Sequence, residues 1–155
     1  MSFMQRWTGL PIVAALFALL GGCASMGGGD IAIRATGAEE VPPVSTSATA
    51  TGTLNVAADR MVSGSFRTQG AAITAAHIHE AAAGQNGPIL IPLQKKGDSE
   101  WVVPANVKLT DKQFETFEAG RLYVNFHSKQ HPRGEIRAQI KPTGTAGGGA
   151  GRSSY

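Results

Sequence analysis

The chain of 155 residues has little that would mark it as a nucleic-acid binder or a membrane-spanning protein. It contains one cysteine, Cys23, so no disulfide bond can form within it. Only 16% of its residues are charged, and 14 basic against 11 acidic residues give a net charge of +3. This near balance argues against nucleic-acid binding, which favours a basic cluster. The apolar run LPIVAALFALLGG, residues 10–22, is too short to span a bilayer comfortably.

That apolar run does fit the apolar region of a secretory signal, and Arg6 precedes it. It leads into LGGC, residues 20–23, which resembles the lipobox of bacterial lipoproteins. The resemblance implies that residues 1–22 are a signal peptide and that Cys23 receives acyl chains. The alternative for Cys23 is an ordinary buried thiol. We expect an anchor in the cell envelope, facing the periplasm or at the outer membrane, and Ala24 favours the outer membrane.

Composition separates a folded part from its two ends. ASMGGGD follows Cys23, so residues 23–30 are expected to be a flexible tether. Residues 142–155 form a Gly-rich tail that cannot bury enough apolar surface to order itself. Residues 31–141 are therefore predicted to form one domain, in which we find no convincing internal repeat.

Within the predicted domain the apolar residues recur with a period of two, which is typical of half-buried antiparallel strands. In SATATGTLNV, for example, Ala48, Ala50, Leu54 and Val56 share one face. Seven strands are predicted, at residues 47–56, 60–67, 73–79, 88–94, 99–105, 121–127 and 134–140. Short strands at this spacing predict an all-β fold, an antiparallel Greek-key-like β-sandwich.

One short helix is predicted within LTDKQFETFEAG, residues 109–120. Thr110 and Gln113 have the spacing of a capping box, and Gly120 stands where a helix C′ glycine is expected. Phe114 and Phe117 would lie on one side of this helix. We expect a crossover helix that closes one end of the sandwich.

Three blocks of the chain, in order, carry a family resemblance. They are ATGAEEVPPVSTSATATGTLNV, AAHIHEAAAGQNGPILIPL and LYVNFHSKQHPRGEIRAQI. Together they resemble the CHRD domain, a module named from chordin and present in many exported bacterial proteins. The resemblance covers about residues 31–140 and implies an all-β module that works outside the cytoplasm. One departure is the run Ala81 to Ala83, which stands where the pattern usually has a glycine.

Two groups of residues in these blocks have the chemistry of turns. Asn86, Gly87 and Pro88 are expected to shape the loop after residue 80, with Asn86 as its left-handed residue. Gly134, in the sequence HPRG, is expected to lie in the turn between the last two strands. We interpret these residues as structural.

The histidines are the strongest candidates for a binding site. His77 and His79 stand two apart on a predicted strand, so they point to one face about 7 Å apart. His127 ends another strand, and if both strands end at the same rim, three imidazoles converge there. His131 or Glu80 would be a fourth ligand. Neutral imidazole is a common ligand for copper and zinc, and such a site is expected to lose metal below about pH 6.5, where imidazole ordinarily protonates.

Two interpretations of the histidines remain open at this point. In the first they only brace the loop at residues 80–88, since each neutral ring has one donor and one acceptor. In the second they hold one copper or zinc ion. HIHE resembles the first copper-ligating segment of copper-zinc superoxide dismutase, but that enzyme's further histidines, aspartate and disulfide are missing here.

We expect an exported, lipid-anchored CHRD-type binding module that is not an enzyme. No serine or cysteine in a recognisable nucleophile motif accompanies the histidines. Its partners would be the membrane, through the lipid, and an envelope protein or ligand. The alternative is a periplasmic copper- or zinc-binding protein with a three-histidine site and redox activity; a third class is a purely structural envelope protein.

The anchor prediction is tested at Cys23. Cys23→Ser should abolish labelling by a fatty-acid analogue and leave the signal uncut at that position, because the acylated thiol is gone. Label that persists on the variant would contradict the lipoprotein assignment.

Overall fold

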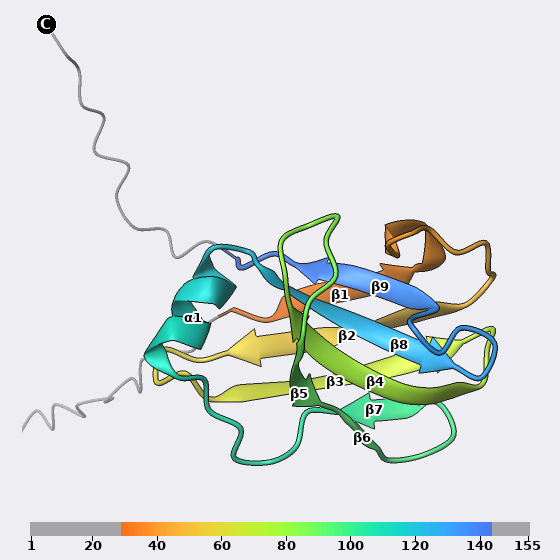
Figure 1. Ribbon diagram of the computed structural model, residues 1–155. Coiled ribbons are helices and arrows are strands. Elements are labelled where there is room, and N and C mark those ends of the chain that lie inside the picture. Colours follow the sequence, from red (N-terminus) through yellow and green to blue (C-terminus); the bar gives the residue numbers. More distant parts are fainter. Residues whose placement is uncertain (1–28, 144–155) are drawn as a thin grey trace, which may run out of the picture.

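The computed structural model describes residues 29–143 (Figure 1). The expected signal peptide, Cys23 and nearly all of the expected tether and tail lie outside the described residues. Among residues 29–143, no helix is long and apolar enough to cross a membrane. The elements in chain order are β1 (Ile31–Thr36), η1 (Gly37–Glu39), β2 (Thr49–Val56), β3 (Val62–Gln69), β4 (Ile73–Glu80), β5 (Ile89–Pro92), β6 (Gln94–Lys95), β7 (Glu100–Val102), α1 (Asp111–Glu118), β8 (Leu122–Ser128) and β9 (Ile136–Ile140).

The strands form one antiparallel sheet in the order β5-β4-β8-β9-β1-β2-β3-β7-β6. β5 and β6 lie at opposite edges, yet only Leu93 separates them in the chain. The Leu93 amide donates to the Ala76 carbonyl at 2.9 Å, which ties this link to β4. The sheet is therefore curled until its two edges nearly meet, as Figure 1 shows.

The core lies inside this curl. Phe66 on β3 and Phe126 on β8 meet edge to face, with ring centroids 5.8 Å apart, although three strands separate β3 from β8 in the sheet. Two halves of the sheet thus pack on each other, and the expected all-β sandwich is confirmed. The period-two pattern of three predicted strands, at residues 60–67, 121–127 and 134–140, puts on their apolar faces five residues that are all buried, namely Phe66, Leu122, Val124, Phe126 and Ile136.

The period-two pattern translates directly into burial on β2. Ala48, Ala50, Leu54 and Val56 are buried, as predicted, and the polar residues between them are more exposed. The alternation arises because successive side chains of a strand point to opposite faces of the sheet. Only one face of β2 packs against the core.

The predicted helix is also confirmed. In α1 the Thr110 side chain accepts from the Gln113 amide, and the Gln113 side chain accepts from the Thr110 amide, so both halves of the capping box are present. Gly120 follows the last turn with φ of 67°, a conformation that glycine adopts without strain. Phe117 is buried under the helix, which lies at one end of the curled sheet (Figure 1).

The sequence interpretation missed one strand and joined two others. β1 was not predicted, although Ile31, Ile33 and Ala35 alternate and are buried between β9 and β2. The prediction of a single strand at residues 88–94 was wrong. It is two strands, because β5 pairs with β4 at one edge while β6 pairs with β7 at the other.

The core is tested at Phe126, which is fully buried. Phe126→Ala should lower the free energy of unfolding by about 3–5 kcal/mol, because the lost contacts leave a cavity between the two halves. Chemical denaturation of the two proteins measures the difference. Ile89→Ala is the control, since Ile89 is 54% exposed and its removal should cost less than about 1 kcal/mol. Equal effects of the two substitutions would contradict the assigned core.

Candidate metal centre

The pairing of β4 with β8 brings three histidines onto one face. The two strands are antiparallel, with His79 opposite Tyr123, His77 opposite Asn125 and His127 opposite Ala75. Residues that pair directly point to the same side of a sheet, so the three imidazoles share the outer face. The condition stated from the sequence, that both strands end at the same rim, is not met, because antiparallel strands end at opposite ends of the sheet. The cluster lies along the strands instead, with His77 between its two neighbours.

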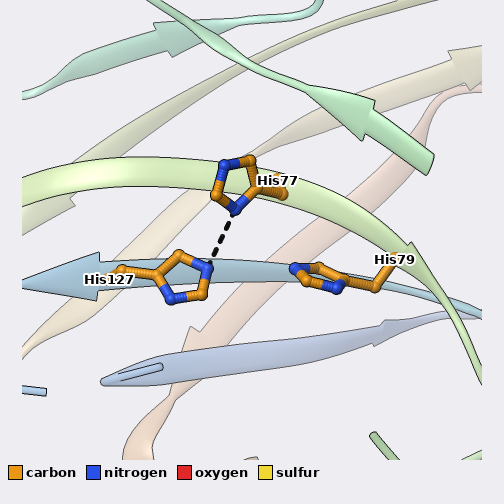
Figure 2. Close-up of side chains that lie close together, drawn as sticks. All are labelled: His77, His79 and His127. Atoms are coloured by element: carbon orange, nitrogen blue, oxygen red, sulfur yellow. Dashed lines mark hydrogen bonds between the residues drawn. The ribbon is translucent and has the colours of Figure 1, made fainter. Parts of the chain in front are cut away.

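The ring nitrogens converge closely. One nitrogen from each of His77, His79 and His127 lies within 4.8 Å of the other two. Nδ1 of His77 is 3.0 Å from Nε2 of His127, the contact dashed in Figure 2. Two nitrogens bound to one ion at 2.0–2.1 Å are separated by roughly 2.8–3.4 Å. The first pair already has this separation, but its two nitrogens face each other along a hydrogen bond. These two rings would have to turn, and the third to move closer, for all three nitrogens to point at one ion.

Backbone carbonyls fix the tautomers of two of the rings. Nδ1 of His79 is 3.0 Å from the carbonyl oxygen of Gly87, and Nδ1 of His127 is 3.2 Å from that of Pro132. A carbonyl only accepts, so each Nδ1 carries the proton and donates. Nε2 of both rings is therefore unprotonated and has a lone pair available. Metal-bound histidines are commonly held by this kind of outer hydrogen bond.

One of these lone pairs has no partner. Nε2 of His79 is fully buried, and no donor among the described residues reaches it. Nε2 of His127, by contrast, accepts from Nδ1 of His77. A buried acceptor left without a hydrogen bond costs about 1–3 kcal/mol. The loop-bracing contacts satisfy only half of the His79 ring.

Burial keeps the three imidazoles neutral. It lowers the pKa of His127 to about 4, with a smaller contribution from neighbouring His77. Burial likewise lowers the pKa of His79 and of His77, and the latter is lowered further by His79. Protonation of each of the three rings will therefore compete with a metal ion at a lower pH than protonation of an ordinary imidazole would.

Aromatic and charged groups pack beside the cluster. The ring of Tyr123 is stacked on that of His79, with centroids 4.9 Å apart and planes 11° from parallel. The guanidinium of Arg137 lies 3.5 Å from the centroid of the Tyr123 ring. The Tyr123 hydroxyl accepts from the Gly87 amide, and the Gly87 carbonyl in turn accepts from His79. Tyr123 and Gly87 together hold His79 in one orientation.

Arg137 and Glu40 belong to this buried polar layer, and sequence reasoning did not identify either. Arg137 is 1% exposed and donates to the carbonyls of Gln85 and Ala82, which pins the loop over the sheet. Glu40 accepts from the Asn125 side chain at 3.3 Å. Burial raises the pKa of Glu40 to about 7, although Arg137 and Asn125 act in the opposite direction. In GEIRAQI, residues 134–140, Arg137 alternates with apolar residues, and this pattern predicts a position that faces the solvent.

The remaining predicted site residues take other roles. Neither His131 nor Glu80 belongs to the group of convergent ligands. Glu80 accepts from the Thr116 hydroxyl at 3.4 Å, and the His131 carbonyl accepts from the Gly134 amide in the turn before β9.

The loop between β4 and β5, residues 81–88, departs from expectation in one respect. Its left-handed residue is Gly84, with φ of 75°, and not Asn86. Asn86 instead donates to the Val41 carbonyl at 2.7 Å. At Gly87 a Cβ atom would lie 1.9 Å from the Glu80 carbonyl oxygen. Gly87 therefore permits a close backbone contact, and Pro88 leads directly into β5.

Fold and site together define an all-β domain with a buried three-histidine cluster on the outside of its sheet. The family model of the CHRD domain matches residues 31–140, so the chain belongs to the CHRD domain family. Membership suggests a binding module, and the CHRD domain is not a known enzyme family. No curated protein and no solved structure matches the chain.

The neutral state of His127 predicts a pH dependence of stability. Between pH 6.5 and pH 4, His127 takes up a proton in the unfolded chain but stays largely neutral in the folded domain, because folding lowers its pKa to about 4. The metal-free domain should thereby lose on the order of 2–3 kcal/mol of stability. Glu40 acts in the opposite direction, since its folded pKa of about 7 favours proton uptake by the folded state.

The two effects are separated by comparison with His127→Gln, because Glu40 is common to both proteins. Urea denaturation at pH 7 and pH 4.5, with a chelator present, measures the change in each. Wild type should lose about 2–3 kcal/mol more than the variant over this interval. Parallel losses would mean that His127 is not held neutral by the fold.

Proposed function

We propose that this chain is a metal-binding module of the bacterial cell envelope, which holds one copper or zinc ion through His77, His79 and His127. Residues 31–141 would form the binding domain, and lipid on Cys23 would attach it to the membrane. No catalytic turnover is part of this proposal. It develops the general role of a binding module, which family membership suggests.

The observation that carries the proposal is the unpaired Nε2 of His79. It is buried, and Figure 2 shows it on the side of the ring that faces His77 and His127. One nitrogen of each of the three rings lies within 4.8 Å of the other two. A role in bracing the loop accounts for Nδ1 of His79 and Nδ1 of His127. It gives no reason for the Nε2 lone pair of His79 to be directed, without a donor, towards the other two rings. A metal ion would satisfy it.

The tautomers also suit metal uptake. His79 and His127 already present unprotonated Nε2 atoms, as their bonds to backbone carbonyls require. His77 donates from Nδ1 in the metal-free state, so its proton must move to Nε2 before Nδ1 can bind an ion. His77 is half-buried, and solvent can exchange that proton. Binding would thus require no net proton release from the three ligands.

The donor set favours copper and zinc over other cations. Three imidazoles with no carboxylate suit the borderline ions Zn²⁺ and Cu²⁺, whereas Mg²⁺ and Ca²⁺ prefer oxygen ligands. Export would expose the domain to metal ions outside the cytoplasm. The same histidines could buffer or deliver such an ion at the cell surface.

Calorimetric titration of the full chain, purified without a histidine tag, tests the proposal. Copper(II) and zinc(II) should each bind with one-to-one stoichiometry at pH 7.5. Binding should still be measurable at pH 5.5, because burial lowers the pKa of all three ligands. His77→Ala, His79→Ala and His127→Ala should each weaken binding at least about tenfold, since each removes one of three ligands.

His131→Ala is the matched control, as it removes the only other histidine of the chain and lies outside the cluster. Its affinity should equal that of the wild type. Absence of binding heat at pH 7.5, or ligand variants that bind as well as His131→Ala, would leave the cluster with a loop-bracing role only.

A further inference from the structure

The three histidines leave a bound ion without a fourth protein ligand. Among the described residues, the convergent group contains His77, His79 and His127 and no cysteine or carboxylate. On the same face, Oδ1 of Asn125 is buried without a hydrogen-bond partner among the described residues, but an amide oxygen suits Mg²⁺ or Ca²⁺ better than copper or zinc. The Tyr123 hydroxyl accepts from the Gly87 amide, and the Asn125 amide group donates to Glu40. Zinc is usually four-coordinate, and sites with three protein ligands keep the fourth position for an exchangeable molecule.

Access to this position is from the side of His77. His79 and His127 are only 8% and 9% exposed, whereas His77 is half-buried and nearer to solvent. In Figure 2 the His77 ring lies above the line between the other two. The open coordination position of a bound ion would therefore face the solvent on the side of His77, while the buried rings of His79 and His127 lie on the side away from the solvent.

The charge of the site selects the kind of molecule that can enter. Three neutral imidazoles leave both positive charges of a divalent ion uncompensated. Arg137 adds a further positive charge nearby, through its contact with the Tyr123 ring that is stacked on His79. Glu40, a buried carboxylate of this layer, accepts from Asn125 and not from a histidine. A small anion would compensate the excess charge.

We infer that the metal-loaded cluster binds one small anion, such as hydroxide or azide, as the fourth ligand of the ion on the solvent side of His77. This inference rests on the proposed metal site and assigns its open position. It makes the site one where a small anionic ligand exchanges at the metal. A permanently closed structural site would admit none.

Azide titration of the copper(II)-loaded chain tests this inference. After one equivalent of copper is bound, as shown by calorimetry, azide at pH 7.5 should produce a new azide-to-copper charge-transfer absorption band that saturates at one azide per copper. The metal-free chain with azide, and copper(II) in a chelator that fills all its positions, should show no such band. His131→Ala, which leaves the cluster intact, should reproduce the wild-type titration.

The outcomes separate the two proposals. Copper that binds stoichiometrically but gives no azide band would overturn the inference of an open position and leave the metal site standing. Failure of copper itself to bind would overturn both. A band that is also retained in His79→Ala with unchanged copper affinity would place the copper at another site and likewise overturn the inference.

Discussion

The register of β4 against β8 is the constraint on which the rest of the structure depends. It places Ile78 opposite Val124 and Ala76 opposite Phe126 on the core side, and all four are buried. The same register fixes the histidines on the outer side, because alternate residues of a strand point to opposite faces. A shift by one residue would exchange the two faces and place imidazoles in the apolar core. Core packing therefore holds the histidines in their mutual positions.

The face of β8 and β9 that points away from the apolar core is also buried, and its side chains are polar. Tyr123, Asn125 and Arg137 are each at most 2% exposed, and the loop between β4 and β5 is hydrogen-bonded to Tyr123 and Arg137. Buried polar groups are usually hydrogen-bonded, and Arg137 donates to the loop carbonyls of Gln85 and Ala82. Arg137 therefore holds the loop in place, and the loop in turn orients His79, since the Gly87 carbonyl sets the tautomer of that ring. Nε2 of that ring has no donor among the described residues, and a metal ion would bind its lone pair.

Local patterns predicted the elements well, and long-range pairing explains what they missed. The capping box at Thr110 and the alternation of β2 depend on residues near in sequence, and both predictions were correct. The spacing of His77 and His79 likewise placed the two rings on one face. How His127 joins them depends on strand register, which the isolated segments do not contain. Arg137 alternates with core residues as an exposed residue would, and only the fold shows that a loop distant in sequence buries it.

The most direct test of the account is a crystal structure of the chain soaked with copper(II) or zinc(II), with anomalous scattering used to locate the ion. The account predicts one ion at about 2.0–2.1 Å from Nδ1 of His77 and from Nε2 of both His79 and His127. The carbonyls of Gly87 and Pro132 should still accept from the Nδ1 atoms of His79 and His127. A crystal that takes up no ion at this position, and keeps the hydrogen bond between His77 and His127, would contradict it.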